Sequence, residues 1–90
     1  MIGAHDTPQV APLFRLQFEP VQDAWVLLYP EGMVKLNTPA AEILRRCDGQ
    51  RSVAAIVEEL ETTFSRRGLA GDVRAFLDQA RGRGWLRGGN

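Results

Sequence analysis

Residues 25–49, WVLLYPEGMVKLNTPAAEILRRCDG, constrain the fold more than any other part of the chain. The segment begins with an apolar run, which predicts a buried strand. Pro30 and Gly32 then supply the fixed φ and the positive φ that a tight turn needs. A second short strand follows, and then a helix that we expect to end at Gly49. A two-stranded ribbon packed on a helix has an open edge and a groove, and both can hold an extended peptide.

Three strands are predicted before the first helix. Residues 13–20 have strand character, and residues 25–29 and 33–36 form the two arms of the hairpin. The run at 25–29 is apolar throughout, which predicts either burial on both faces of the strand or one buried face and one face covered by a partner. Alternation along the last strand puts two residues on each face, Val34 with Leu36 and Met33 with Lys35.

Three amphipathic helices are predicted after the strands. Their expected capping residues are Thr38, which precedes a proline at the first helical position, Ser52 and Asp72. Glycines follow each helix and are expected to end it. The apolar stripes, in chain order, are Ala40, Ile43, Leu44 and Cys47; Val53, Ile56, Val57, Leu60 and Phe64; and Val73, Phe76, Leu77 and Ala80.

This order of elements predicts an α+β domain. We expect an N-terminal three-stranded antiparallel sheet followed by three helices, with an outline similar to a winged helix-turn-helix. The domain is expected to span residues 13–87. Residues 1–12 have no apolar period and are predicted to form a flexible arm, and residues 88–90 a flexible tail.

The charge balance and the cysteine content narrow the class of protein. Eleven basic residues balance eleven acidic ones, which argues against a nucleic-acid binder that depends on a broad basic field. The start of the chain has neither the basic region nor the apolar core of a signal peptide, and no membrane span is recognisable. Cys47 is the only cysteine, which fits a reducing compartment. The sequence therefore predicts a cytoplasmic protein.

No residue pattern in the chain predicts catalysis. The only histidine, His5, lies in the expected arm, where nothing rigid would position it as a base. Cys47 lies on an apolar stripe and is expected to be a buried small hydrophobe rather than a reactive thiol. No second cysteine or histidine stands at a metal-ligand spacing. We therefore expect a protein that is not an enzyme and that binds no cofactor or metal.

Two groups of arginines are compatible with partners other than a peptide. Arg45, Arg46 and Arg51 are interpreted either as a solvated rim or as a surface for an anionic partner. The winged-helix outline makes nucleic-acid binding the alternative function, because the third helix carries Arg74, Arg81 and Arg83. Two aspartates, Asp72 and Asp78, stand among these arginines and weaken that alternative. A small domain with an apolar sheet edge is also compatible with a homodimer.

Several of these features together resemble one known family. They are LLYPEG at 27–32, Leu36-Asn37, the AEIL run at 41–44, Asp48-Gly49 and the terminal Gly84-Trp85-Leu86. In these residues the chain resembles the PqqD family of pyrroloquinoline quinone biosynthesis, over about residues 12–87. The turn and its spacing to the first helix are the most specific part of the match.

The resemblance implies a function without chemistry of its own. PqqD-like proteins are peptide chaperones, similar to leader-recognition domains for ribosomally made and modified peptides. The implied partners are the precursor peptide PqqA and the radical S-adenosylmethionine enzyme PqqE, to which the peptide is presented. The iron–sulfur clusters and S-adenosylmethionine would then belong to the partner enzyme.

The position of the strand and helix in the resemblance implies a peptide site. The receiving edge would be the strand at 33–36, and the third helix would face it. The expected peptide-binding residues are Met33, Val34, Lys35, Leu36, Val73, Phe76, Leu77 and Ala80. Backbone hydrogen bonds would supply affinity that tolerates different sequences, and the apolar side chains would select the residues of the peptide.

Overall fold

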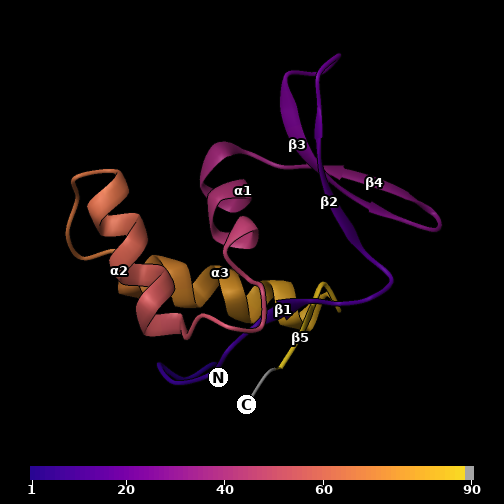
Figure 1. Ribbon diagram of the computed structural model, residues 1–90. Helices are drawn as coiled ribbons and strands as arrows, with labels where there is room; N and C mark the ends of the chain where they lie inside the picture. The colour runs from indigo at the N-terminus through magenta and orange to yellow at the C-terminus, as the bar shows by residue number, and fades with distance from the viewer. Residues whose placement is uncertain (89–90) are drawn as a thin grey trace.

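Helices and antiparallel strands segregate along the chain in the computed structural model, which describes residues 1–88 (Figure 1). Four strands come first, followed by three helices and a final short strand. In order they are β1 (Gln9–Val10), β2 (Arg15–Glu19), β3 (Ala24–Tyr29), β4 (Gly32–Lys35), α1 (Thr38–Arg45), α2 (Val53–Thr63), α3 (Ala70–Gly82) and β5 (Leu86–Arg87). The predicted α+β class is confirmed.

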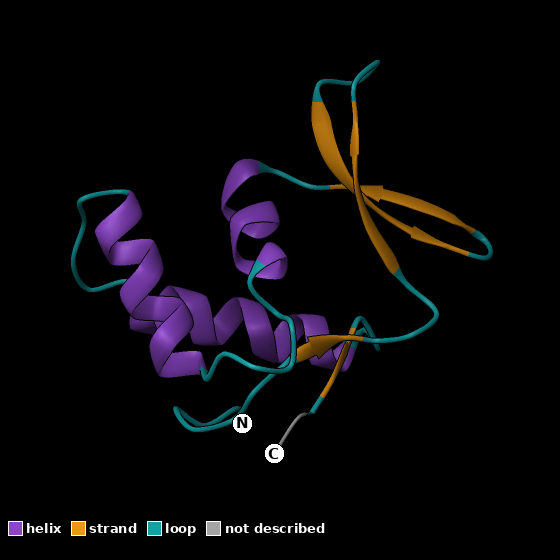
Figure 2. Ribbon diagram, viewed as in Figure 1, coloured by secondary structure: helices purple, strands orange, loops and turns teal. Residues whose placement is uncertain are grey.

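The strongly apolar strand β3 lies at the centre of a three-stranded antiparallel sheet. The strand order is β2-β3-β4, and the two hairpins twist across each other (Figure 2). Leu27 belongs to the main core, and Val26, which points to the other face of the sheet, is equally inaccessible to solvent. Of the two predicted alternatives, burial on both faces is the one observed at these two residues. Tyr29 pairs with Gly32 across the expected turn, and Gly32 has a φ of +158°.

The first element of the fold is not this three-stranded sheet, as the sequence led us to expect. β1 precedes it and forms a second, two-stranded sheet with β5, in which Val10 pairs with Leu86. Two-residue strands carry too few residues for an alternating pattern, so sequence reasoning missed this pairing. The winged-helix outline stays a prediction.

Residues 1–12 pack against the helices rather than forming a separate arm. Ile2 is 1% exposed, and its backbone N–H donates to Asp78 of α3 at 2.7 Å while its carbonyl accepts from Arg74. The carbonyls of Asp6 and Ala4 accept from the first two backbone amides of α2, at 2.8 and 3.0 Å. The expectation of a flexible arm is therefore wrong, because this segment satisfies helix groups that would otherwise lack partners. Residues 89–90 of the predicted tail lie outside the described residues.

The helix starts match the predicted positions to within a few residues, but two of the three caps differ. Ser52 caps α2 as expected and accepts from the Ala55 amide. Asn37, not Thr38, caps α1, and its side chain accepts from the amide of Ala40. Asp72 lies inside the first turn of α3 instead of capping it, since that helix already begins at Ala70.

The core forms around α1, which lies between the three-stranded sheet and the other two helices (Figure 1). Half of the helix is buried, namely Ala40, Ala41, Ile43 and Leu44. The helix ends at Arg45, before the expected stop at Gly49, because the backbone tightens into a turn that buries Cys47. Among the described residues no helix has both the length and the apolar character of a membrane span.

Cys47 is part of the core and its thiol is protected. The side chain is 4% exposed, and its Sγ donates to the Ile43 carbonyl at 3.3 Å. Burial raises the pKa of the Cys47 thiol from 9.0 to about 12, and the neighbouring Asp48 carboxylate adds to this rise. The folded protein therefore holds the thiol in its neutral form, as expected for a buried hydrophobe.

Replacing Leu44 tests the central position of α1. Leu44 is 1% exposed, so Leu44→Ala should lower the free energy of unfolding by roughly 2–4 kcal/mol through lost burial and the cavity left behind. Urea denaturation followed by circular dichroism would measure the change. Leu13→Ala is the matched control, because Leu13 is 74% exposed. Equal midpoints for the two variants would show that α1 does not anchor the core.

The thiol predicts a pH dependence of stability. The pKa of Cys47 is higher in the folded protein than its ordinary value. The contribution of the neutral thiol to the free energy of unfolding is therefore complete below about pH 9 and is lost as the pH rises toward 12. The stability difference between wild type and Cys47→Ala should therefore shrink from about pH 8 to about pH 11. Subtracting the two proteins cancels the titration of other groups, and a difference that stays constant over this range would contradict the prediction.

Candidate functional site

The free edge of β4 offers backbone groups that no strand of the sheet uses. β4 is an edge strand, and its register pairs Val34 with Leu27 and Lys35 with Val26. The Leu36 amide donates to the Trp25 carbonyl at 2.9 Å, which identifies alternate residues as the hydrogen-bonded pairs. The N–H and C=O groups of positions 33 and 35 therefore point away from β3, toward the open edge.

A groove of about 370 Å³ lies between β4 and α3, and we call it the β4–α3 groove. Its floor comes from the first turns of α1 and its two walls from the strand and the helix. The strand wall and the loop after it contribute Val34, Lys35, Leu36 and Asn37. The floor contributes Pro39, Ala40 and Ile43, and the helix wall Asp72, Phe76, Gln79, Ala80, Arg83 and Trp85.

The structure gathers most of the predicted peptide-binding residues around this groove. Those that line it are Val34, Lys35, Leu36, Phe76 and Ala80. Phe76 is half-buried, with part of its side chain accessible. Their role in peptide binding stays a prediction, but their common location is a property of the fold.

Three predicted residues lie elsewhere. Leu77 is fully buried and lines neither this groove nor any other hollow described below, so it supports the wall from within the core. Met33 is 49% exposed and lies outside the groove, within 3.9 Å of the Gln22 amide nitrogen. Val73 faces a second hollow on the far side of Pro39.

Sequence reasoning missed the polar members of the helix wall. Asp72, Gln79 and Arg83 share a face with Phe76, because their spacing follows the helical period. The prediction followed the apolar stripe of α3, and most of that stripe is buried. The spacing of 72, 76, 79 and 83 was the signal that could have identified this wall.

The end of α3 fixes Trp85 at one end of the groove. Gly84 has φ +79°, a conformation that favours glycine. Its amide donates to the Arg81 carbonyl, and the amide of Trp85 donates to the Ala80 carbonyl at 2.9 Å. These two bonds form a Schellman motif. The guanidinium of Arg83 lies over the indole ring at 5.4 Å. The turn thus places an aromatic surface and a cation beside each other.

The charges along the helix wall change sign from one end to the other. Asp72 is in the first turn of α3 and Arg83 follows its last residue, so the two ends of the groove differ in charge. Lys35 adds a second cation on the strand wall. An extended peptide would therefore meet one acidic end and one basic end.

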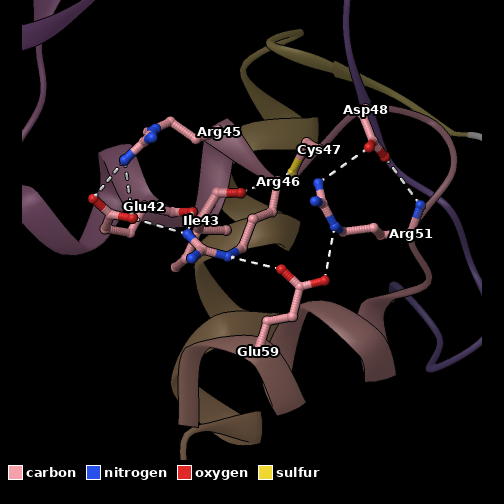
Figure 3. Close-up of polar contacts among 8 residues, drawn as sticks. All are labelled: Glu42, Ile43, Arg45, Arg46, Cys47, Asp48, Arg51 and Glu59. Atoms are coloured by element: carbon pink, nitrogen blue, oxygen red, sulfur yellow. Dashed lines mark hydrogen bonds and ion pairs between the residues drawn. The ribbon is translucent and has the colours of Figure 1, made fainter. Parts of the chain in front are cut away.

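A separate ionic cluster holds the helices that support the groove (Figure 3). Glu42 accepts from Arg46 at 2.8 Å and from Arg45 at 3.0 Å. The hydrogen bond from Arg46 is the main reason that the pKa of Glu42 lies below its ordinary value. Arg45 also lies 4.9 Å from the ring centre of Trp25, which connects α1 to the sheet.

The same cluster links α1 to α2 through Glu59. Its two carboxylate oxygens accept from Arg46 at 3.2 Å and from Arg51 at 2.8 Å (Figure 3). Backbone amides of Gln50 and Arg51 donate to Asp48 and lower the pKa of that carboxyl group. All three arginines of this cluster are ion-paired, so they form a supporting network rather than an unpaired basic rim.

Comparison with known proteins identifies relatives that span almost the whole chain. A PqqA binding protein of Azotobacter vinelandii is 53% identical over 83 residues, which are 91% of this chain and 90% of the relative. A PqqA binding protein of Methylococcus capsulatus is 46% identical over 79 residues, 88% of this chain and 85% of the relative. These names describe binding rather than a reaction.

A solved structure has the same fold. It is the solution NMR structure of the PqqD truncation of Methylobacterium extorquens PqqCD, described as a functional and stand-alone recognition element for ribosomally synthesized and post-translationally modified peptides. The TM-score is 0.81 at 26% sequence identity, and the match covers 97% of this chain and 95% of that one. The antiparallel sheets and three helices described above therefore have the same arrangement as in that solved structure.

The family assignment follows from the match to a whole family as well as to single relatives. The family model of coenzyme PQQ synthesis protein D (PqqD) matches residues 24–86, which contain the hairpin, all three helices and the Gly84 turn. Its members are named for binding and recognition, which confirms the prediction that the chain is not an enzyme. The chain belongs to the PqqD family.

Proposed function

We propose that this protein is a peptide chaperone that binds the precursor peptide PqqA by strand addition along β4. In this proposal it presents the bound peptide to the radical S-adenosylmethionine enzyme PqqE in the cytoplasm. The observation that carries the proposal is the free edge of β4, whose outward N–H groups at positions 33 and 35 lie beside the β4–α3 groove. The names of the relatives support the same peptide as partner.

The arrangement of the groove explains how one peptide strand could satisfy both walls. Side chains of an extended strand alternate between two faces, so one set would point toward Phe76 and Ala80 and the other toward solvent. The backbone would pair with Met33 and Lys35 without removing any bond of the existing sheet. For presentation, the part of the peptide that is modified has to extend beyond the groove. Because the chaperone holds the rest of the peptide, the effective concentration of that part at the enzyme is raised.

The alternative function, nucleic-acid binding, has less support from the arginines of α3. Arg74 donates to the Ile2 carbonyl at 3.1 Å, and Arg81 lies 3.8 Å from the Asp6 carboxylate. Arg83 lies over Trp85. Each cation thus has a partner within the domain, whereas a recognition helix needs such groups free for bases and phosphates. A homodimer through a sheet edge stays a prediction.

Backbone amide exchange tests the strand addition directly. In the free protein the amides of Met33 and Lys35 should exchange fast, and PqqA should slow them by roughly tenfold or more because they become hydrogen-bonded. The amides of Val34 and Leu36 point into the sheet and serve as internal controls, already protected without peptide. Unchanged exchange at both outward amides under saturating peptide would exclude strand addition at this edge.

A substitution separates the backbone of Lys35 from its side chain. Lys35→Pro removes an outward N–H and no bond of the sheet, so it should weaken binding by about 1–2 kcal/mol. Lys35→Ala keeps the N–H and is the matched control, measured by the same calorimetric titration. If both variants lose affinity equally, the ammonium group rather than the backbone donor is responsible.

Phe76 tests the apolar wall. Its ring is half-buried beside the groove, so Phe76→Ala should weaken peptide binding by about 1–3 kcal/mol if the ring is an anchor. Phe14→Ala is the control: Phe14 is also half-buried, packs on Tyr29 at 5.7 Å and lies outside the groove. Equal affinities of the two variants for PqqA would remove Phe76 from the site.

A further inference from the structure

A second hollow opens where the β4–α3 groove ends, and we call it the Phe64 pocket. Its volume is about 360 Å³, within the range of pockets that enclose small ligands. Leu60, Phe64, Leu69 and Val73 form its apolar side. The pocket shares Pro39, Ile43 and Asp72 with the groove, so the two hollows have a common boundary at the start of α1.

Phe64 is not part of the hydrophobic core, although it follows the apolar residues of α2. It is the last residue of the apolar stripe predicted for α2. Instead it caps the end of that helix and remains 42% exposed. A large aromatic side chain left half in solvent at the mouth of an apolar pocket is a common feature of binding sites.

Two hydrogen bonds to Glu61 hold the loop after Phe64, which carries Arg66 and Leu69 of the pocket lining. The Glu61 carboxylate accepts from the Leu69 amide at 3.0 Å, and the carbonyl of Glu61 accepts from the Arg66 amide at 2.9 Å. Glu61 therefore fixes both ends of the short turn that carries Leu69.

The direction of β4 indicates which part of a peptide would reach this pocket. β4 runs toward Asn37 and Pro39, so the Phe64 pocket lies beyond its C-terminal end. All strands of the existing sheet are antiparallel, and antiparallel pairing has the straighter and slightly more stable hydrogen bonds. A peptide added antiparallel to β4 would place the residues upstream of its paired segment over Pro39.

We propose that the Phe64 pocket is a second subsite for the precursor peptide and receives an apolar side chain just upstream of the segment that pairs with β4. This inference rests on the proposed function and adds a second anchor to it. The rim carries Arg66 and Asp72, while the charge of Glu42 is already balanced by Arg45 and Arg46. The interior therefore selects an apolar side chain, and the groove and pocket together select a spacing along the peptide.

A double-mutant cycle between protein and peptide tests the subsite. The probe is synthetic PqqA from the same genome, titrated at full length and in two truncation series, which remove one residue at a time from the N-terminus or from the C-terminus. Phe64→Ser should weaken binding of the full peptide about tenfold, equivalent to 1.4 kcal/mol. Loss of the residue that fills the pocket should cost wild type the same factor and should cost Phe64→Ser almost nothing further.

Two further variants keep the result interpretable. Phe18→Ser is the matched control, because Phe18 is also 42% exposed but lies on β2, outside both hollows. It should bind both peptides as wild type does. Leu69→Ala shortens the opposite side of the pocket and should reproduce the coupling seen with Phe64→Ser, which guards against a folding defect of one variant.

The outcomes distinguish this inference from the proposed function. Coupling of both pocket variants to the upstream residue supports the subsite. If wild type binds the full peptide tightly and both pocket variants bind it equally well, the subsite is overturned. The proposed binding in the β4–α3 groove would be unaffected by that result. Coupling to residues removed from the C-terminus instead would mean a parallel peptide and would also overturn it. Absence of binding by wild type would overturn the proposed function itself.

Discussion

The packing of α1 between the sheet and the other helices is the constraint on which the rest of the structure depends. A helix of eight residues is not stable alone in water, so its burial has to hold it together. Ile43 and Leu44 supply that burial, and the Asn37 cap fixes where the helix begins. The same first turn forms the floor of the β4–α3 groove and the boundary of the Phe64 pocket. The shape of both hollows therefore follows from the position of one short helix.

The N-terminal segment has a corresponding role on the other side of α3. The contacts of Ile2 with Asp78 and Arg74 join the start of the chain to the middle of that helix. β1 and β5 then join it to the segment that follows. The opposite face of α3 carries Phe76 and borders the groove. Residues far from the site in sequence thus hold one of its walls.

The sequence predicted those parts of the fold that depend on local patterns. The hairpin, the three helices, the Ser52 cap and the burial of Cys47 all follow from spacing within a few residues. The missed features depend on distant partners. Ile2 is buried through contacts with α3, and Glu61 of α2 satisfies the amide at the start of α3, a position where we had expected Asp72 to act as the cap. No pattern near either residue reveals such a partner.

The candidate site divides in the same way. The resemblance implied the strand wall at residues 33–36, and the register shows that this strand is β4, at the edge of the sheet. Of the four residues predicted on α3, Phe76 and Ala80 line the groove, whereas Leu77 is in the core and Val73 lines the Phe64 pocket. The polar residues Gln79 and Arg83 of the same wall were not predicted. Periodicity identifies the buried stripe of a helix but not which of its flanks borders a hollow, because that depends on where the next element packs.

The energetics of strand addition explain why the apolar hollows matter as much as the free edge. Two outward residues offer about four backbone hydrogen bonds, each worth roughly 0.5–1.5 kcal/mol net. Ordering each residue of a flexible peptide costs about 1–2 kcal/mol, so the ladder alone does little more than offset the cost of its own formation. The remaining affinity must come from apolar side chains that leave water, at roughly 25 cal/mol per Å². In the proposed complex the edge of β4 would therefore set the path of the peptide, and Phe76 and the Phe64 pocket would determine which peptide is bound and how tightly.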